Sequence, residues 1–270
     1  MTKIVKTSSH PRALLALVLL CAALLIAWFV YRHQRPGGNT ADLLQPPQTA
    51  VHSLSDETIA KWTKLLKVKP NDDAAWASLG DAFMEKARET LDLSYYGRAE
   101  RAYGKAISLN SKNIAATNGM AWINGGRHEF EKCIQWDKKA IALDPTDEPA
   151  YGLWGDADQE MGDYEAAYTH YQKMLDLHPD FSSWTRGARW CWLTGNTRKA
   201  ELLYREAITA GASYKENVAW ARAQLGLIYF NDGDYAAAEN ILLEGLNFSP
   251  NNYHLLSIMG RVQAAKKDYA

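Results

Sequence analysis

The chain has 270 residues and a formal net charge of −1, and 47% of its residues are hydrophobic. A balance this close to neutral excludes the strongly basic surface that nucleic-acid-binding proteins present. The chain has three cysteines, none in a Cys-Xaa-Xaa-Cys pair, which excludes a disulfide framework and a cysteine metal site.

An apolar segment near the N-terminus predicts a membrane anchor. Residues 13–31 read ALLALVLLCAALLIAWFVY, a run that as a helix spans a hydrocarbon core of about 30 Å. Trp28 and Tyr31 lie at its end, where amphipathic rings favour the headgroup layer. No small-residue cleavage site follows, so we expect a retained signal anchor; the alternative is a cleaved signal peptide.

The basic residues around this segment predict its orientation. Lys3, Lys6 and Arg12 precede it, whereas Arg32 and Arg35 follow it. The positive-inside rule then makes residues 1–12 a cytoplasmic tail and places the rest of the chain outside the cytoplasm. In a bacterium this is a single-pass inner-membrane protein with a periplasmic domain.

A segment rich in proline and glycine separates the anchor from the folded domain. Residues 32–53 contain the sequences RPGG and QPPQ, which predict a flexible linker. Ser55, Asp56 and Glu57 then indicate a helix start, and a helix over residues 58–68 ends before Pro70. The folded domain is predicted over residues 54–270.

A repeat with a period of about 34 residues runs through this domain. Pro145, Pro179 and Pro250 each close one segment of the pattern. Between them, small and aromatic residues recur in phase, as at Gly155 and Tyr171. A period of this length predicts stacked helical hairpins, because each hairpin buries its apolar face only against its neighbours.

In their spacing these segments resemble the tetratricopeptide repeat (TPR) family, in which small residues let two helices approach closely and large ones fill the space between them. The resemblance implies an all-α, right-handed superhelix of helix-turn-helix repeats over residues 54–270. The apolar run of residues 13–31 places one transmembrane helix before it. A last helix from Tyr253 to about Lys266 is expected to cap the superhelix.

The copies of the repeat differ in length and in how well they match the pattern. The first copy carries extra residues around 86–92, which predict a longer hairpin, and the second departs from the pattern at Asn124 and Asp137. The in-phase copies contain Trp76, Leu79, Gly80, Ala99 and Tyr103; Thr117, Met120, Ala121, Cys133 and Ala140; Tyr151, Trp154, Gly155, Ala167 and Tyr171; Trp184, Ala188, Ala200 and Tyr204; and Leu225, Gly226, Ala238 and Leu242.

The first helix of each hairpin lines the concave face of such a superhelix, and helical spacing then selects the residues that face into it. The early part of this surface is acidic and small, and the later part is aromatic and basic. Large aromatic side chains on a polar concave face are typical anchors for a peptide or an amphipathic helix. The alternative for each aromatic is packing against the neighbouring hairpin. The predicted partner-binding residues are Asn118, Trp122, Asp156, Arg189, Trp192, Trp220, Phe230 and Arg261.

No motif indicates catalysis. The histidines form no metal-binding pair, and no nucleophile elbow, Walker loop or dinucleotide fingerprint is present. We therefore expect no catalytic residue, metal or cofactor. The carboxylate clamp that some TPR proteins use to hold chaperone C-termini is also excluded, because Ala77 and Asp81 replace the lysine and asparagine it needs.

The sequence thus predicts a membrane-tethered, non-enzymatic scaffold or adaptor. It would bind a peptide or a partner subunit in its concave groove and would not bind nucleic acid; self-association is left open. As an alternative, the anchor, the linker and the first hairpin resemble the TPR subunits of bacterial cytochrome c maturation, which present apocytochrome for haem attachment. A third interpretation is an organelle import receptor with cytosolic repeats.

Overall fold

Twelve α-helices make up residues 53–267, the part of the chain that the computed structural model describes. The predicted cytoplasmic tail, the anchor and nearly all of the predicted linker lie outside these residues. Within the described part, no helix combines the length and the apolar character needed to cross a membrane. The helices are α2 (Leu54–Val68), α3 (Asp73–Thr90), α4 (Ser94–Leu109), α5 (Ile114–Gly126), α6 (Phe130–Leu143), α7 (Glu148–Met161), α8 (Tyr164–Leu177), α9 (Phe181–Leu193), α10 (Thr197–Ala210), α11 (Lys215–Asn231), α12 (Tyr235–Phe248) and α13 (Tyr253–Lys266).

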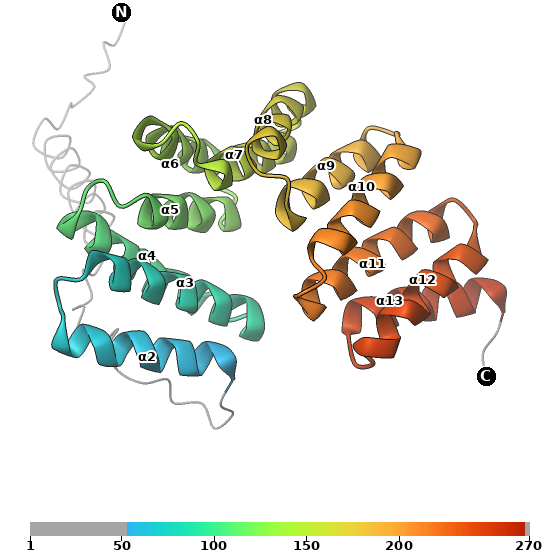
Figure 1. The fold of residues 1–270 in the computed structure, drawn as a ribbon, viewed down its shortest axis with the longest axis horizontal. Helices are drawn as coiled ribbons and strands as arrows, with labels where there is room; N and C mark the ends of the chain where they lie inside the picture. Colours follow the sequence, from blue (N-terminus) through green and yellow to red (C-terminus); the bar gives the residue numbers. More distant parts are fainter. Residues whose placement is uncertain (1–52, 268–270) are drawn as a thin grey trace, which may run out of the picture. The chain divides into compact units, whose positions relative to one another are not determined.

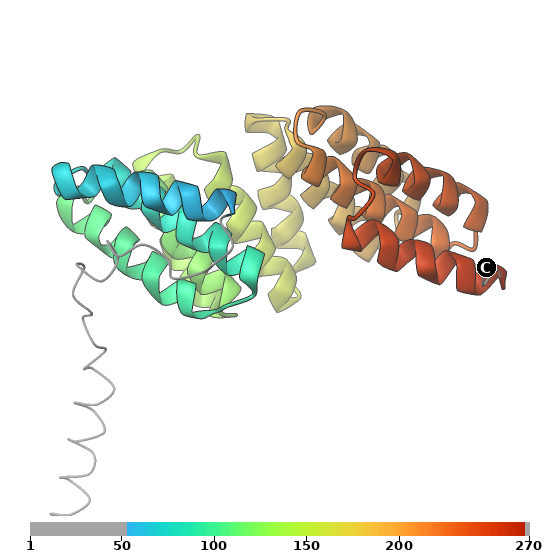
Figure 2. The ribbon, with the colours of Figure 1, turned by 90° about the horizontal axis from the view of Figure 1, so that it is seen from below.

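The helices stack as hairpins in chain order (Figure 1). Each odd-numbered helix from α3 to α11 pairs with the helix that follows it, while α2 packs on α3 and α13 packs on α11 and α12. Each odd-numbered helix also contacts the next odd-numbered helix, whereas the even-numbered helices do not contact one another. The odd-numbered helices are therefore the inner layer of the stack. The view from below shows the hairpins following one another from the blue helix α2 to the red helix α13 (Figure 2). The predicted all-α repeat of hairpins is confirmed for these residues.

Asparagine and aspartate side chains cap the N-termini of most of these helices. Asp72, Asn113, Asp163 and Asp234 each accept a hydrogen bond from a backbone N–H in the first turn of the helix that they precede. The start predicted for α2 is wrong. This helix begins at Leu54, because Ser53 caps it in a reciprocal arrangement with Asp56.

The turn inside each hairpin needs a left-handed backbone conformation. Gly162, Gly195 and Gly233 occupy this position with φ of 88°, 84° and 79°. In the second hairpin the equivalent residue is His128, with φ of 58°. A residue with a Cβ atom is strained in this region, so His128 marks the one departure among these four turns.

Close contact between the two helices of a hairpin explains the small residues of the repeat. A Cβ atom on Gly155 of α7 would lie 2.6 Å from Cε1 of Tyr171 on α8. Tyr171 is itself buried, with 4% of its surface exposed. Only glycine allows this approach, and the ring then fills the space between the helices.

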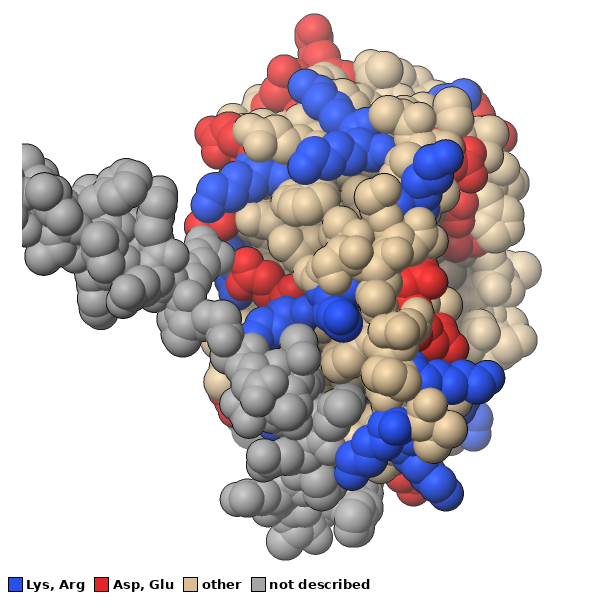
Figure 3. Space-filling view, turned by 90° about the vertical axis from the view of Figure 1, so that its left-hand side faces the viewer, with Lys and Arg blue, Asp and Glu red and all other residues tan. Residues whose placement is uncertain are grey.

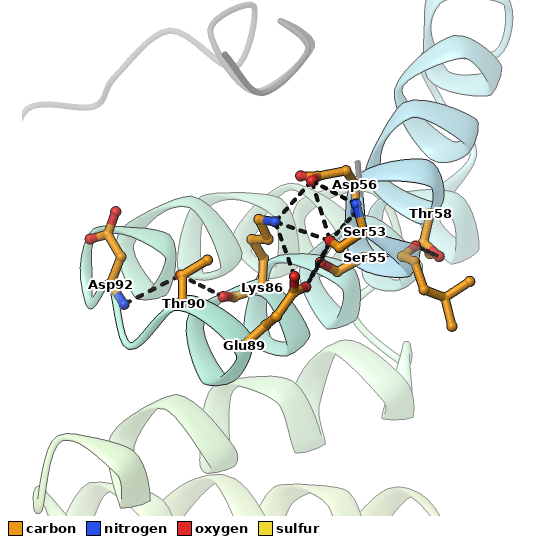
Figure 4. A network of polar contacts seen from close by, with 9 residues as sticks. Ser53, Ser55, Asp56, Thr58, Lys86, Glu89, Thr90 and Asp92 are labelled. Atoms are coloured by element: carbon orange, nitrogen blue, oxygen red, sulfur yellow. Dashed lines mark hydrogen bonds and ion pairs between the residues drawn. The ribbon is translucent and has the colours of Figure 1, made fainter. Parts of the chain in front are cut away.

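The first hairpin is longer than the others, as the sequence predicted. Its helices α3 and α4 have 18 and 16 residues, against 13 and 14 in α5 and α6. The added length of α3 carries Lys86 and Glu89 to the start of α2 (Figure 4).

A buried ion pair fastens α2 to α3. The Nζ atom of Lys86 donates to Oδ2 of Asp56 at 2.9 Å and to Oγ of Ser53 at 3.1 Å. The two charged side chains are only 3% and 4% exposed. Burial alone opposes both charges, but the pair outweighs it: Asp56 and Glu89 raise the pKa of Lys86, and Lys86 and Ser53 lower the pKa of Asp56.

Charges of both signs are interspersed on the face at the left of Figure 1 (Figure 3). Lys and Arg side chains border an uncharged area there, and Asp and Glu side chains lie among them. This face therefore carries no extended field of one sign.

Candidate functional site

A groove of about 1020 Å³ runs along the inner helices of the stack. It extends from the start of α2 and the end of α3, across α7, α9 and α11, to the first residues of α13. Its lining includes Glu85, Arg88, Asp156, Gln159, Glu160, Arg186, Arg189, Glu216, Trp220 and Tyr253.

A second hollow of about 720 Å³ lies among α3, α5, α7 and the start of α9. It contains Asn118 and Trp122, together with apolar residues such as Leu153. Arg88 and Arg186 line both hollows, so the two form one continuous concave surface. We call this surface the concave groove.

The floor of the concave groove is held by a three-residue polar cluster. Arg186 of α9 donates from Nε to Oδ1 of Asp156 at 3.0 Å and from Nη2 to Oδ2 at 2.8 Å. The hydroxyl of Tyr171 on α8 donates to Oδ1 of Asp156 at 2.9 Å. Burial, followed by the carboxylate that its hydroxyl contacts, raises the pKa of Tyr171. Asp156 thus joins three helices, and its oxygens are occupied within the fold.

The first hairpin repeats part of this arrangement. The hydroxyl of Tyr103 on α4 donates to Oδ1 of Asp81 on α3 at 2.7 Å. Asp81 and Asp156 occupy the same place in their repeats, as do Tyr103 and Tyr171. The tyrosine ring packs between the two helices, and its hydroxyl reaches a carboxylate on the inner surface. This tyrosine therefore connects the packing of a hairpin to the polar floor of the groove.

A second ion pair joins the same inner helices nearer the solvent. Nη2 of Arg189 on α9 lies 3.2 Å from Oε1 of Glu160 on α7, with side chains that are 53% and 44% exposed. Arg189 and Arg186 are three residues apart, and Glu160 and Asp156 are four apart, so both pairs lie on facing sides of α7 and α9. An exposed pair of this kind contributes little to stability but is available to a ligand.

Two half-buried tryptophans lie in the walls of the groove. Trp122 of α5 has the Arg88 guanidinium 5.9 Å from its ring centroid. Trp220 of α11 makes edge contacts with Phe181 and Tyr204, both with ring centroids 6.3 Å apart. Each indole therefore has a protein-packed side and lines the groove. Such rings resist reorientation, which suits them to hold an apolar side chain.

Of the eight predicted partner-binding residues, the structure brings five to the concave groove: Asn118, Trp122, Asp156, Arg189 and Trp220. Trp192, Phe230 and Arg261 do not line either hollow. Trp192 and Phe230 are half-buried against the core of the last hairpins. The Arg261 guanidinium lies 4.6 Å from the centroid of the Phe230 ring.

Sequence reasoning missed Arg88 and Arg186, which join the two hollows. Arg88 lies in the last turn of α3, beyond the length that α5, α7 and α9 reach. Arg186 had a signal in the sequence: with Arg189 it forms an i,i+3 pair on α9, facing the i,i+4 pair of Asp156 and Glu160 on α7. These two spacings are compatible with the ion pairs, but the angle between the two hairpins decides which carboxylate each arginine meets.

The groove is lined by polar and aromatic side chains. Within residues 53–267, no group of His, Cys, Asp and Glu could hold a metal ion. The two described cysteines, Cys133 and Cys191, are unpaired and buried, and burial raises the pKa of both thiols. The side chains that the groove offers are guanidinium, carboxylate, carboxamide and indole groups, which bind a polypeptide by hydrogen bonds and apolar contact.

A family model described as "Tetratricopeptide repeat" matches residues 221–252, which contain most of α11 and the whole of α12. The stacked hairpins of residues 53–267 have a TPR-like fold. The crystal structure of the APC/C hetero-tetramer Cut9–Hcn1 superposes with a TM-score of 0.65 at 18% identity, over 85% of this chain and 42% of that one. The crystal structure of PilW, a type IV pilus biogenesis factor, gives a TM-score of 0.57 at 18% identity, over 76% of this chain and 90% of that one. At these identities the likeness concerns the fold.

Among curated proteins, the chain is similar in sequence to small glutamine-rich tetratricopeptide repeat-containing protein 2 of Mycosarcoma maydis, with 33% identity over 111 residues. The match covers 40% of this chain and 30% of that protein, so the chain spans less than a third of the relative's length.

Proposed function

We propose that this TPR protein is a non-enzymatic scaffold that holds an extended segment of a partner protein in its concave groove. The observation that carries this proposal is the continuity of the two hollows, which Arg88 and Arg186 join into one surface along the inner helices. A surface of this length fits an extended polypeptide better than it fits a compact small molecule.

The polar floor supports the same proposal. Arg186 and Asp156 satisfy each other before any ligand arrives, so binding does not have to order them. Oδ1 of Asn118 has no hydrogen-bond partner in the fold, and its Nδ2 atom is held by Asp147 at 2.8 Å. A small rotation of this carboxamide lets it accept a backbone N–H of the bound segment.

The half-buried tryptophans supply the apolar part of the binding energy. Trp122 and Trp220 lie in different hollows, so they would contact different side chains of one bound segment. Truncating an anchor of this kind commonly costs about 2 kcal/mol of binding or more.

The proposal includes the predicted membrane tether. Residues 13–31 would hold the TPR domain near a membrane through the linker of residues 32–53, with the domain on the periplasmic side of an inner membrane. Fusing an export-dependent reporter after Ser53 tests this topology. Activity of a cytoplasmic reporter at the same position would reverse it.

Site-specific photo-crosslinking in cells tests the groove directly. A photoreactive phenylalanine analogue replaces Trp220 inside the groove, or Trp136 on the outer helix α6 as a matched half-buried control. We expect a defined protein adduct from position 220 and none from position 136. Adducts from position 136 alone would place binding on the outer face and overturn the proposal.

The alternative function differs in its ligand and uses the same groove. If the protein presents apocytochrome for haem attachment, a peptide with a Cys-Xaa-Xaa-Cys-His motif should bind more tightly than a peptide with both cysteines replaced by serine. Equal binding of the two peptides would leave the general scaffold function in place and remove this alternative.

A further inference from the structure

The two ends of the repeat domain have the sequence patterns of the two halves of one hairpin. In the third repeat, the second helix carries Ala167, Tyr171 and Met174, followed by Pro179. At the start of the domain, α2 carries Thr58, Trp62 and Leu65 with the same spacing, followed at the same distance by Pro70. By this register, α2 is the second helix of a hairpin whose first helix is missing from residues 53–267.

The last helix has the complementary pattern. Tyr151, Trp154 and Gly155 of α7 face α8, and Leu256, Met259 and Gly260 of α13 have the same spacing. The residues that precede them agree as well, because Pro250 stands before Leu256 as Pro145 stands before Tyr151. By this register, α13 is the first helix of a hairpin whose second helix is missing from residues 53–267.

The face of α13 that would receive this second helix is bare. A Cβ atom on Gly260 would meet nothing within 4 Å, whereas one on Gly155 would meet the Tyr171 ring at 2.6 Å. Leu256 is 47% exposed and Tyr253 is 69% exposed. Large apolar side chains around a small residue, exposed on one helix face, favour close approach of another helix.

We propose that α13 of one copy of this protein packs against α2 of a second copy and so completes a hairpin between the two chains. Trp62 of the second copy would lie over Gly260 of the first, as Tyr171 lies over Gly155 within each chain. The other face of α2 stays packed on its own α3. The repeat stack thus continues from one copy into the next, and the contact leaves a free α2 and a free α13 at the ends for further copies.

The direction of packing agrees with one pair of end charges. In a hairpin the end of the first helix adjoins the start of the second, so the last turn of α13 meets the first turn of α2. Lys266 lies in the former, where it pairs with Glu239 of its own chain at 2.8 Å, and Lys267 follows it at the C-cap; Glu57 lies in the latter. Elsewhere on α2 lysines outnumber acids, as at Lys61 and Lys64. Apolar contact therefore carries the association, and added salt should strengthen it by screening the lysines.

The substitution Gly260→Leu tests the contact without disturbing the fold. It fills the space that the Trp62 ring would occupy, while its Cβ atom meets nothing of its own chain within 4 Å. The matched control is Gly104→Leu on α4, another exposed helical glycine whose Cβ would meet nothing within 4 Å. Both variants should melt at or slightly above the wild-type temperature, because leucine favours helix over glycine.

Sedimentation velocity of the full chain over a wide concentration range measures self-association. We expect the wild type and Gly104→Leu to form dimers and larger species as concentration rises. Gly260→Leu should raise the dissociation constant at least about tenfold, which corresponds to ~1.4 kcal/mol. A wild-type chain that stays monomeric would overturn the proposal, as would equal association of the two glycine variants.

Mixing two variants tests the head-to-tail geometry. Gly260→Leu blocks the α13 end and leaves α2 intact, whereas Trp62→Glu blocks α2 and leaves α13 intact. Together they should form a one-to-one pair and no larger species. If circular dichroism shows that Trp62→Glu disturbs α2, Leu65→Glu replaces it. Failure of the two variants to pair would exclude this contact. If another part of the same chain covers α13 instead, Gly260→Leu should lower the melting temperature, and this result would also overturn the proposal.

Discussion

Arg186 on α9 binds the carboxylate of Asp156 on α7 through three hydrogen bonds, at 3.0, 3.1 and 2.8 Å. The two residues belong to successive hairpins, and this contact ties their inner helices together beneath the groove. Tyr171 holds the same carboxylate from a third helix. The pair thus fixes the relative position of two repeats as well as the shape of the binding surface.

Replacing Arg186 with methionine should weaken this link. The change keeps the apolar stem but removes the charge, so Asp156 keeps only its bond from Tyr171. The two side chains are 23% and 42% exposed, so we expect a loss of about 1–2 kcal/mol in the free energy of unfolding. Urea denaturation measures the loss. In a double-mutant cycle with Asp156→Asn, additive effects would show that the two residues are not coupled.

Substituting Gly155 with leucine should destabilise the domain strongly. The new side chain must displace the Tyr171 ring, which a Cβ atom alone would already approach to 2.6 Å. Overpacking of this kind costs about 1–3 kcal/mol or more. Thermal melting beside Gly104→Leu, which has open space, separates overpacking from any general effect of leucine in a helix. An unchanged melting temperature for Gly155→Leu would contradict the close α7–α8 contact.

Asp137 should make the stability of the domain depend on pH. Its side chain is 0% exposed, Sγ of Cys133 donates to its Oδ2 at 3.4 Å, and its Oδ1 has no partner. Burial, together with the nearby Asp156 and Asp158 of α7 and Asp147 at its N-cap, raises the pKa of Asp137 to about 8 from the ordinary 3.8. The folded chain therefore keeps a proton that the unfolded chain releases above pH 3.8.

Because the folded pKa is the higher one, this contribution to stability is fully present below pH 3.8 and is lost as the pH rises to about 8. Between about pH 5 and about pH 7.5 the loss should be on the order of 2–3 kcal/mol. Asp137→Asn should remove most of this slope, whereas the exposed control Glu206→Gln should keep it. An unchanged slope in Asp137→Asn, measured by urea unfolding at several pH values, would rule out Asp137 as its source.

Removing Lys86 should loosen α2. In Lys86→Met, Asp56 is left as a buried carboxylate without its cation, a change that typically costs about 3–5 kcal/mol. The double variant Asp56→Asn/Lys86→Met should recover much of this loss, because no charge is then left unpaired. Hydrogen exchange of the α2 amides measures the effect locally. Equal protection in wild type and Lys86→Met would mean that apolar contacts alone hold α2.

Relieving the turn at His128 should stabilise the second hairpin. This residue has φ of 58° where three other hairpins have glycine. His128→Gly removes the clash of a Cβ atom in the left-handed region, a gain of about 1 kcal/mol that is partly offset by the greater freedom of glycine in the unfolded chain. Thermal melting should show a small rise. The reverse change at the equivalent turn, Gly162→His, should lower the melting temperature, and a rise there would show that this turn does not require glycine.

Much of the architecture could be predicted from the sequence because its determinants are local. Gly155 and Tyr171 lie on adjoining helices of one hairpin, so their spacing along the chain fixes which residues meet. The turn glycines and the aspartate and asparagine caps act within a few residues of their own position. Repetition of these local rules identified the stacked hairpins and the longer first hairpin.

The concave groove depended on the tertiary structure because it lies between hairpins. Whether Trp220 lines the groove or Trp192 packs against the core is decided by the rotation of one hairpin relative to the next, which no local spacing records. The same rotation sets Arg186 against Asp156, a contact between residues 30 positions apart. The sequence by itself determined the kind of repeat and the places where helices touch within it, through short-range packing. Only the tertiary structure decided which side chains share the groove, because that follows from the accumulated angles between successive hairpins.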